Sequence, residues 1–569
     1  MKKAFLYILS LGGVLLLLSY TVIRYNLDQH LLATFKNNSL EINTDAPLLA
    51  EVSLTNNLPT RKVNTFPHFT LKIYDSNKWD LNNEMISRIP EDIPVMITVE
   101  THETKLFSYY NNPLADVQDG SYDRAIENLC TKVIGNRPHV YIRFNPEMEV
   151  PTRLYQWQQK SGYIEAFQHF FKVCKTYAPQ AKIVWGPASY PGAMEFYPGD
   201  DYVDVATISL KSDSEKLLKV YPKDYSIEYD LMRRVHRLRF MNKPIYVLGS
   251  RQTAKDSLTA TALAELGKHI HENRDNIYSD ENYQRAPRDS DNHPSSPIAI
   301  GLYDPQSLLN DEKEVTVEHL FADFSNLDSG AFQKSFQAVE KRGHDIIVTF
   351  EPFRNPNGET DLDVLRQVSN GAYDQQIKQL YTVISSTNRK VYLRYAHEME
   401  IPITRYPWQS QNPIDYIKSF RYFMTFMEPL PPHIARVWGP AGDRGSIEWW
   451  PGNDVVEYIS IAIYGLPDKN ITDPKKQETF KTIFERKNKR MRFIDKPIFI
   501  TEFGVKGPEE FQTKWLEDAA EVIRDHKQII GVNYFNMSDT PKAWGEIKPP
   551  DWSISKASFN RFIEVLEKE

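Results

Sequence analysis

The chain has 569 residues, of which 41% are hydrophobic and 25% are charged, and its formal net charge is −7. A single hydrophobic core stops growing well below this length, so we expect at least two domains. The near balance of charges excludes a basic surface for nucleic acid, and two cysteines are too few for a disulfide framework.

The first element in chain order is an apolar run from Ala4 to Ile23, preceded by two lysines. Its 20 residues (23 − 4 + 1) would rise about 30 Å as a helix, enough to cross the hydrocarbon core of a bilayer. No small-residue cleavage site follows, so residues 1–23 are predicted to be a transmembrane signal anchor, with a cleaved signal peptide as the alternative. The positive-inside rule then places the bulk of the protein outside the cytoplasm, at the periplasm or cell surface. The polar residues 24–65 are interpreted as a juxtamembrane stalk.

The rest of the chain carries one sequence pattern twice. VYLRYAHEMEIPITRYPW at Val391 matches VYIRFNPEMEVPTRLYQW at Val140, 251 positions earlier (391 − 140). VWGPA at Val437 matches the same five letters at Val184, 253 positions earlier (437 − 184). An offset this constant over such a distance indicates a duplicated domain.

The two copies diverge toward their starts and their ends. KIYDS at Lys72 is aligned with GLYDP at Gly301, an offset of 229 (301 − 72), which predicts that the first copy has lost 22 residues (251 − 229). After its last helical segment, the first copy passes into the polar, proline-rich residues 279–297, interpreted as a linker. Residues 66–278 are therefore predicted to be a degenerate domain, and residues 298–569 a complete one.

Short apolar runs alternate with longer amphipathic segments in each copy. In the second copy the strand-like runs are AIGLYD, DIIVTFEP, KVYLRYAHE, RVWGPA, YISIAIYG, PIFITEFG and IIGVNYFNM. Continuous apolar strands alternating with helices predict a parallel sheet, and seven or eight such units in about 270 residues fit a (β/α)₈ barrel. The predicted fold is thus α/β, with two tandem TIM-type barrels, the first shortened, after an N-terminal transmembrane helix.

Polar side chains stand where the strands of the second copy end, which is where such barrels place their catalytic groups. Two of them, Glu398 and Glu502, are carboxylates on well-separated strands. Hydrolysis of a glycosidic bond with retention needs one carboxylic acid to protonate the leaving oxygen and a second carboxylate, about 5–5.5 Å away, to attack the anomeric carbon. The other candidates at strand ends are Glu351, Arg394, His397, Tyr464 and Asn536.

YLRYAHEM together with the downstream FITEFG resembles glycoside hydrolase family 26, a family of retaining (β/α)₈ enzymes. The resemblance covers residues 298–569, with 66–278 as a degraded copy. It implies that Glu398 is the general acid/base and Glu502 the nucleophile. It also implies that His397 lies near the reacting sugar, that Tyr464 donates to the nucleophile and that Arg394 lies beneath the site. Ring faces for stacking on sugars would come from Trp408, Trp438 and Trp544.

Members of that family cleave β-mannans, and some cleave β-glucans or β-xylans, without a cofactor. The resemblance therefore implies a retaining β-glycosidase acting on a β-mannan or β-glucan type of polysaccharide, and the predicted anchor places this enzyme at a membrane, outside the cytoplasm. Two readings of individual residues stay open. Glu351 and Arg394 could be a structural support pair, because the first copy keeps Glu100 and Arg143. The tryptophans could belong to the core, since Trp438 recurs as Trp185.

The first copy has lost most of these site residues. It keeps Glu147 at the position of Glu398, but a lone carboxylate cannot perform double displacement, so residues 66–278 are predicted to be a pseudo-enzyme domain for docking or glycan binding. This makes a rival function credible for the whole chain: a non-catalytic glycan-binding or scaffold protein of an exopolysaccharide synthesis or export system. Transglycosylation by the same pair is a third reading. The counterparts of His397, Tyr464 and Glu502 are Pro146, Lys211 and Gly249.

Overall fold

The structure is a computed structural model in which the chain divides into two compact units, residues 1–272 (unit 1) and 273–569 (unit 2). The predicted anchor and nearly all of the predicted linker lie outside the described residues, and so do Lys211 and Trp544. Within the described part of the chain, no helix combines the length and apolarity needed to cross a bilayer. The described residues are 39–42, 47–54, 67–73, 84–101, 113–150, 160–210, 226–250, 253–279, 297–353, 362–402, 406–465, 478–539 and 549–568.

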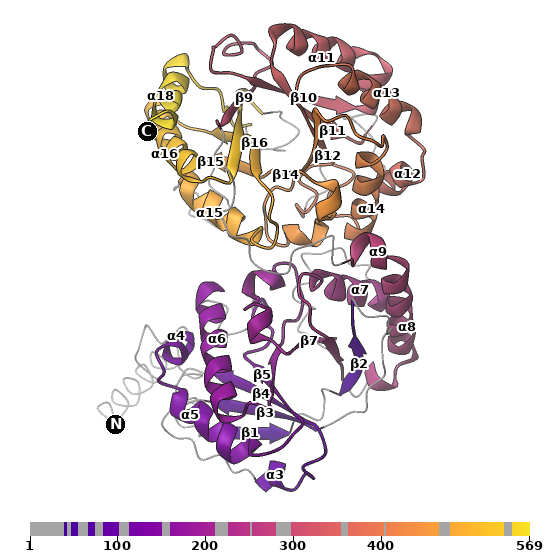
Figure 1. Cartoon of the computed structure of the whole chain (residues 1–569), viewed down its shortest axis with the longest axis vertical. Helices are drawn as coiled ribbons and strands as arrows, with labels where there is room; N and C mark the ends of the chain where they lie inside the picture. The colour runs from indigo at the N-terminus through magenta and orange to yellow at the C-terminus, as the bar shows by residue number, and fades with distance from the viewer. Residues whose placement is uncertain are drawn as a thin grey trace, which may run out of the picture. The chain divides into compact units, whose positions relative to one another are not determined.

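Unit 2 is a closed ring of parallel strands, which confirms the predicted TIM-type barrel (Figure 1). β14 and β15 together supply one staggered position, and pairing of β14 with β16 as well as with β13 completes the ring. The strands are rich in β-branched residues and almost wholly buried, as parallel strands covered by helices must be. They are β9 (Ala299–Tyr303), β10 (Val317–Asp323), β11 (Asp345–Glu351), β12 (Val391–Tyr395), β13 (Ile434–Trp438), β14 (Tyr458–Ile459), β15 (Ala462–Gly465), β16 (Ile498–Val505) and β17 (Ile529–Phe535).

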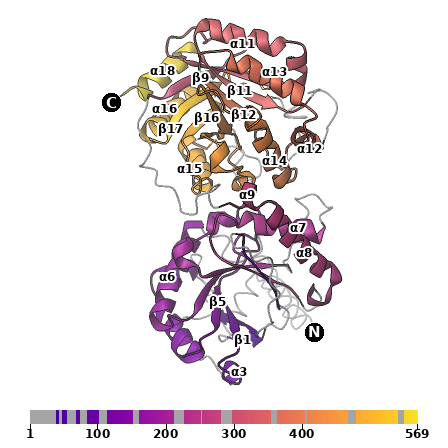
Figure 2. The ribbon, with the colours of Figure 1, turned by 45° about the vertical axis from the view of Figure 1, so that its right-hand side comes forward.

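Helices surround this ring (Figures 1 and 2). Several of them begin at a side chain that accepts a hydrogen bond from a backbone N–H of the first turn, as Asn412, Thr479 and Ser555 do. The helices are α10 (Phe324–Asp328), α11 (Ala331–Arg342), α12 (Val364–Ser369), α13 (Asp374–Ser385), α14 (Pro413–Met424), α15 (Phe480–Arg490), α16 (Glu509–Asp525) and α18 (Lys556–Leu566), with the short α9 (Arg274–Ile277) before the barrel.

The described residues of unit 1 form an open half-barrel, which agrees with the predicted shortening of the first copy but does not reach a full (β/α)₈ ring. Six parallel strands form its sheet, and one antiparallel strand pairs with each edge, β1 with β3 and β2 with β8. The described strands thus form a half-barrel with β1 and β2 at its two ends. They are β1 (Ser39–Ile42), β2 (Leu48–Val52), β3 (His68–Ile73), β4 (Val95–Thr101), β5 (Val140–Phe144), β6 (Lys182–Trp185), β7 (Val205–Ser209) and β8 (Ile245–Leu248).

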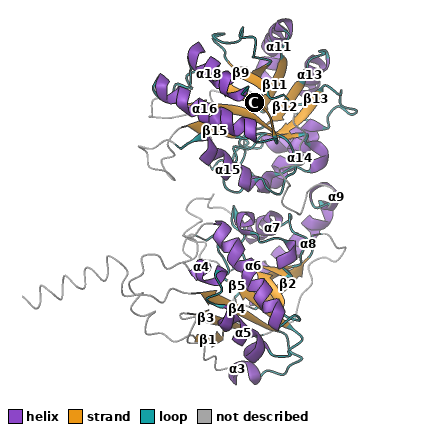
Figure 3. Cartoon of the chain, turned by 60° about the vertical axis from the view of Figure 1, so that its left-hand side comes forward, coloured by secondary structure: helices purple, strands orange, loops and turns teal. Residues whose placement is uncertain are grey.

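The two edge strands come from the segment interpreted as a stalk, and the interpretation does not hold for these residues. In β2, Leu48, Ala50 and Val52 are buried while the residues between them are half-buried, the alternation expected of a strand with one face on a core. The helices of unit 1 lie on the outside of the sheet (Figure 3). They are α3 (Glu84–Ser87), α4 (Pro113–Gln118), α5 (Asp123–Asn128), its continuation η1 (Leu129–Ile134), α6 (Lys160–Tyr177), α7 (Ile227–Arg237) and α8 (Ser257–Glu272).

The alignment of Lys72 with Gly301 is also wrong. His68 of β3 is paired in register with Met96, and His319 of β10 with Ile347. Both members of each pair keep the offset of 251 (319 − 68 and 347 − 96), so β3 is the counterpart of β10, and no 22 residues are lost between β3 and β4. Unit 1 instead has β1 and β2 at the positions next to β3 and β8, where unit 2 has β9 and β17.

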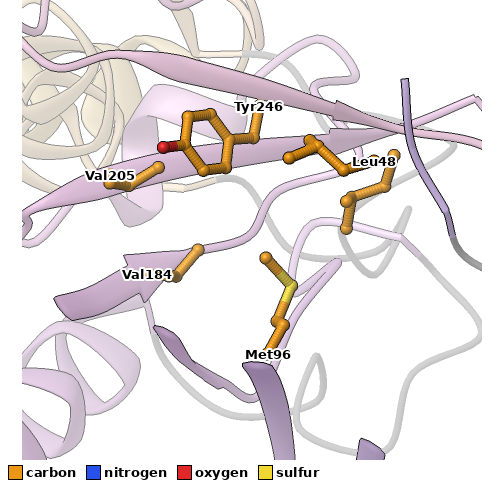
Figure 4. Packing of buried hydrophobic residues seen from close by; sticks show 6 residues of the cluster. Leu48, Met96, Val184, Val205 and Tyr246 are labelled. Carbon is orange, nitrogen blue, oxygen red and sulfur yellow. The ribbon is translucent and has the colours of Figure 1, made fainter. Parts of the chain in front are cut away.

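The interior of each sheet is packed by side chains from corresponding positions. In unit 1, Leu48 of β2 packs with Met96, Val184, Val205, Tyr246 and Leu248 (Figure 4). In unit 2 the equivalent cluster contains Val317, Ile347, Tyr392, Ala435, Val437 and Phe499. The edge strand β2 therefore contributes Leu48 to the same kind of core in unit 1, although the described strands there do not close a ring.

Candidate active site

Arg394 is the best-buried charged group of the barrel in unit 2, with 0% of its surface exposed. It lies on β12, in register with Thr349 of β11 and Val437 of β13. A Cβ atom on Gly439 would lie 2.3 Å from the Nε of Arg394, so the guanidinium reaches its position only because residue 439 has no side chain. The glycine at position 439 thus allows the Arg394 guanidinium to be buried inside the barrel, and a buried positive charge needs a counter-ion.

Glu502 of β16 is that counter-ion. Its Oε1 accepts a hydrogen bond from Nη1 of Arg394, and its Oε2 accepts one from the Tyr464 hydroxyl at 3.0 Å. Only 8% of the Glu502 side chain is exposed. Both carboxylate oxygens are therefore held by donors, one of them charged, and this fixes the orientation of the group that the resemblance assigns as the nucleophile.

Glu398 lies just beyond the end of β12 on an unusual turn. Its φ is 52° and that of Ala396 is 46°, so two non-glycine residues adopt the left-handed region. The backbone N–H of Glu398 donates to the carbonyl of Gly439 at 2.8 Å, which anchors the turn to the end of β13. Such conformations persist where the surroundings enforce them and are common at functional sites. The half-buried Glu398 is thus presented at the same end of the barrel as Glu502.

Burial and nearby carboxylates raise the pKa of two tyrosine hydroxyls at this end of the barrel. Burial, followed by the charges of Glu502 and Glu398, raises the pKa of Tyr464 well above its ordinary value. Burial, followed by the charges of Glu351 and Glu502, raises the pKa of Tyr303 at the end of β9 to about 12. Both phenols stay protonated, and three carboxylates from three different strands act on one end of the barrel.

His397 lies between these carboxylates and a group of aromatic rings. Its Nε2 is 4.0 Å from Oε1 of Glu351, and only 3% of the residue is exposed. Its ring centroid lies 5.4 Å from that of Tyr406 and 6.0 Å from that of Trp408. His397 precedes Glu398 in the chain and lies close to Glu351 in space, and its contact with a sugar stays a prediction.

The prediction that Trp408 and Trp438 offer ring faces to a sugar is wrong, since both are 0% exposed. The indole N–H of Trp408 donates to the carbonyl of His397 at 2.7 Å, so this residue supports the turn instead. Two half-buried rings that the sequence did not single out, Phe353 and Tyr406, lie parallel to Trp408, with centroids 5.6 and 4.6 Å away. The sequence contained one signal for these rings, their place in the motifs: Phe353 ends TFEPF, and Tyr406 lies within TRYPW.

A polar layer lies beneath the carboxylates. Nη1 of Arg394 also donates to the hydroxyl of Thr349 at 3.4 Å, and that oxygen lies 2.7 Å from Nε2 of His319. Burial and the charge of Arg394 hold the pKa of His319 well below its ordinary value, so this imidazole is neutral. Unit 1 keeps the same contact, with 2.7 Å between His68 Nε2 and Thr98 Oγ1, which identifies the pair as part of the shared fold.

Glu400 is a further buried carboxylate that the sequence did not reveal as important. Its Oε1 accepts hydrogen bonds from the N–H groups of Gly442 and Asp443 and from the hydroxyl of Ser446. In unit 1, Oε1 of Glu149 accepts from the N–H of Tyr190 at 3.1 Å. The sequence signal for this carboxylate was the motif EME, which occurs in both units. In each unit its second glutamate accepts hydrogen bonds from the loop that follows the next strand, β6 in unit 1 and β13 in unit 2.

In unit 1, other side chains lie close to the position that corresponds to Glu502. Its counterpart there is Gly249 (502 − 253), and a Cβ atom on that residue would lie 2.4 Å from both Cδ1 of Leu49 and Oγ1 of Thr253. Leu49 belongs to β2, the added edge strand. Glu147, the counterpart of Glu398, still has the left-handed φ of 58°. The left-handed turn thus survives in unit 1, while Leu49 and Thr253 crowd the position where unit 2 has its second carboxylate.

No protein-family model matches the chain. The β-1,3-xylanase TXYA of a Vibrio species is 29% identical over 251 residues, which are 37% of this chain and 49% of that enzyme. A β-1,3-xylanase of an Alcaligenes species is 24% identical over 223 residues, 35% of this chain and 46% of that enzyme. The chain thus matches about half the length of each of these curated relatives.

A solved structure, the Podospora anserina GH26-CBM35 β-(1,4)-mannanase, shares 12% identity over 48% of this chain and 62% of its own, with a TM-score of 0.33. The named relatives are glycan-hydrolysing enzymes, and they do not single out family 26. Together with the closed barrel and the carboxylates at its C-terminal end, these relatives confirm the predicted relation of the chain to glycoside hydrolases.

Proposed function

We propose that unit 2 is a retaining endo-β-glycanase with Glu502 as nucleophile and Glu398 as acid/base. One observation carries this proposal: Glu502 is held at both carboxylate oxygens, by Arg394 and Tyr464, at the barrel end that also presents Glu398. If Glu502 served only to neutralise the buried Arg394, it would not need a second donor. Tyr464 is such a donor, and the charges of both Glu502 and Glu398 act on its hydroxyl.

The chemistry follows from these positions. The Glu502 oxygen attacks the anomeric carbon while Glu398 gives its proton to the leaving glycosidic oxygen, and a glycosyl ester on Glu502 results. Glu398 then takes a proton from water, which attacks the same carbon from the opposite face of the ester and restores the original configuration. Arg394 and Tyr464 hold the free carboxylate in line before attack and stabilise it again as it leaves.

A β-linked polysaccharide is the proposed substrate. The relatives named β-1,3-xylanase put β-1,3-xylan on the test panel beside the β-mannan and β-glucan implied by the resemblance. The full chain is incubated with each polymer, release of reducing ends is measured, and proton NMR of the first products gives their anomeric configuration. We expect cleavage of at least one polymer with the β-anomer appearing first.

The matched variants are Glu502→Gln, Glu398→Gln and, in unit 1, Glu147→Gln. We expect the first two to lose at least about 10³-fold in kcat/KM and the third to keep the wild-type rate. An α-anomer as first product would contradict double displacement, and an equal loss in Glu147→Gln would contradict the assignment to unit 2. Binding of a polymer without cleavage would favour the rival glycan-binding or scaffold function.

The setting of the enzyme is also a proposal. The apolar run Ala4–Ile23 supports membrane anchoring with both units outside the cytoplasm, and the filled nucleophile position at Gly249 supports a non-catalytic role for unit 1 in docking or glycan binding. Fractionation of cells that produce the full chain tests the first point. Recovery of the chain in the soluble cytoplasmic fraction would refute it.

A further inference from the structure

Two cysteine thiols face each other inside unit 1. Cys130 lies in η1 and Cys174 in α6, and their sulfur atoms are 3.0 Å apart. Both residues are 0% exposed. A disulfide bond is about 2.05 Å long, so the sulfurs need to approach by about 1 Å to form one, a movement within the reach of side-chain torsions.

The backbone that carries Cys130 has a special form. At Leu129–Ile134 the helix that begins as α5 becomes a π-helix, and the N–H of Gly135 bonds to the carbonyl of Cys130 at 3.1 Å. The corresponding helix of unit 2, α13, remains α-helical over Asp374–Ser385. A π turn within an α-helix is uncommon and frequently marks a functional position.

Unit 2 shows how the same helix interface is filled without cysteines. The counterpart of Cys130 is Tyr381 (130 + 251), which is 0% exposed. Its hydroxyl donates to the carbonyl of Phe423 at 2.9 Å, and its ring packs against Phe426 with 6.1 Å between centroids. Unit 1 has lost this large ring and its hydrogen bond, and has two sulfur atoms in contact instead.

We propose that Cys130 and Cys174 form an intramolecular disulfide that joins the helix of η1 to α6. The two thiols lose two protons and two electrons and gain one S–S bond, while the disulfide of a thiol–disulfide exchange partner, or oxidised glutathione, is reduced to two thiols. The bond ties two helices whose cysteines are 44 positions apart (174 − 130) and takes over the stabilisation that Tyr381 gives unit 2.

The bond forms before the interface is fully closed. Burial and the neighbouring Cys130 raise the pKa of the Cys174 thiol well above its ordinary value, so in the packed interface it does not supply the thiolate that exchange requires. Once formed, the disulfide is shielded from solvent on both sides. Bonds of this kind persist outside the reducing cytosol, which agrees with the proposed extracytoplasmic setting without depending on it.

The test uses the full chain refolded in a glutathione redox buffer, then denatured and alkylated without reductant. Digestion and mass spectrometry should find the peptides containing Cys130 and Cys174 joined, and free of alkyl groups. Alkylation of both cysteines in the monomer, or cross-links only between chains, would overturn the proposal. In Cys130→Ser, Cys174 should become fully alkylated.

A thermal measurement separates a functional bond from an incidental one. Wild type folded under oxidising conditions should unfold roughly 5 to 15 °C higher, in the transition of unit 1, than wild type folded in reductant. The double variant Cys130→Ala and Cys174→Ala should show no such difference between the two conditions. An equal melting temperature for oxidised and reduced wild type would contradict the stabilising role.

Discussion

Unit 1 and unit 2 keep the same arginine at the same strand position and use it differently. In unit 1, Nε of Arg143 donates to Thr207 at 2.8 Å and its Nη2 donates to Ser209 at 3.2 Å. In unit 2, Nε and Nη2 of Arg394 have no hydrogen-bond partner in the part of the chain that the structure describes, and Nη1 is directed at Glu502. The arginine serves the candidate nucleophile only where other acceptors do not compete for it.

Two substitutions remove that competition. The counterpart of Ser209 is Ala462 (209 + 253), which has no acceptor in its side chain. The counterpart of Thr207 is Ser460 (207 + 253), whose hydroxyl is paired with that of Thr501. The two units therefore differ in the acceptors around the arginine as well as in the residue at the position of Glu502. A catalytic site of this kind depends on missing acceptors as well as on present ones.

Contacts that hold the loops have survived in both units. Arg234 donates to the carbonyls of Ala188 and Ser209, and Lys487 (234 + 253) donates to those of Ala441 and Ala462. Each acceptor pair is again 253 positions apart. Unit 1 has thus kept the bonds that shape the end of the barrel while it lost the side chains that would act there.

Among substitutions outside the two candidate carboxylates, the largest effect should come from Arg394→Lys. Lysine keeps the positive charge, but its shorter, unforked side chain does not hold a donor where Nη1 of Arg394 meets both Glu502 and Thr349. We therefore expect kcat/KM to fall about 10²- to 10³-fold on the polymer that wild type cleaves. Arg143→Lys in unit 1 is the matched control and should leave the rate unchanged. Steady-state kinetics on both variants check this, and equal losses would place Arg143 in the active site.

Tyr464→Phe should have a smaller effect. The substitution removes the hydroxyl that donates to Oε2 of Glu502 and helps to fix the orientation of this carboxylate, so kcat/KM should fall about 10- to 100-fold. Steady-state kinetics on the polymer that wild type cleaves check this. An unchanged rate would show that the Tyr464 hydroxyl does not serve the nucleophile.

Ala462→Ser tests the competition for Arg394 directly. The new hydroxyl would offer the guanidinium the acceptor that Ser209 provides in unit 1, and we expect a loss of about 2- to 10-fold in kcat with little change in KM. Ser209→Ala in unit 1 should leave the kinetics unchanged. An increase in rate for Ala462→Ser would contradict the comparison between the two arginines.

The smallest effect concerns the stability of unit 2. Burial and the charge of Asp443 raise the pKa of Glu400 above its ordinary value of 4.5. The folded state therefore binds the proton of the Glu400 carboxyl more tightly than the unfolded chain does. As a result, the contribution of Glu400 to stability falls as the pH rises above the ordinary pKa of 4.5 and through the raised pKa of the folded state. Glu400→Gln keeps an acceptor and never ionises, so its unfolding free energy relative to wild type should increase between pH 4 and pH 7. Denaturant titrations at the two pH values check the sign.

The sequence singled out Arg394, Tyr464 and Glu502 because each carries chemistry that depends on residue type. The structure joins these three side chains by hydrogen bonds, and their catalytic roles stay predictions. The tryptophans failed because a large aromatic ring suits a core and a sugar cleft equally, and only the fold decides which face it has. The start of unit 1 failed because KIYDS and GLYDP share letters, while strand identity is set by hydrogen-bonded register, which places His68 opposite Met96.

The edge strand β2 of unit 1 is synthesised long before the strand with which it pairs. β2 leaves the ribosome 193 residues before its partner β8 begins (245 − 52), and the apolar face formed by Leu48, Ala50 and Val52 has no sheet to cover until then. Pairing at such long range is slow to form and leaves strand edges open meanwhile. A shortened chain that starts after residue 52 would leave β3 and β8 as bare edges of a parallel sheet, ready to aggregate.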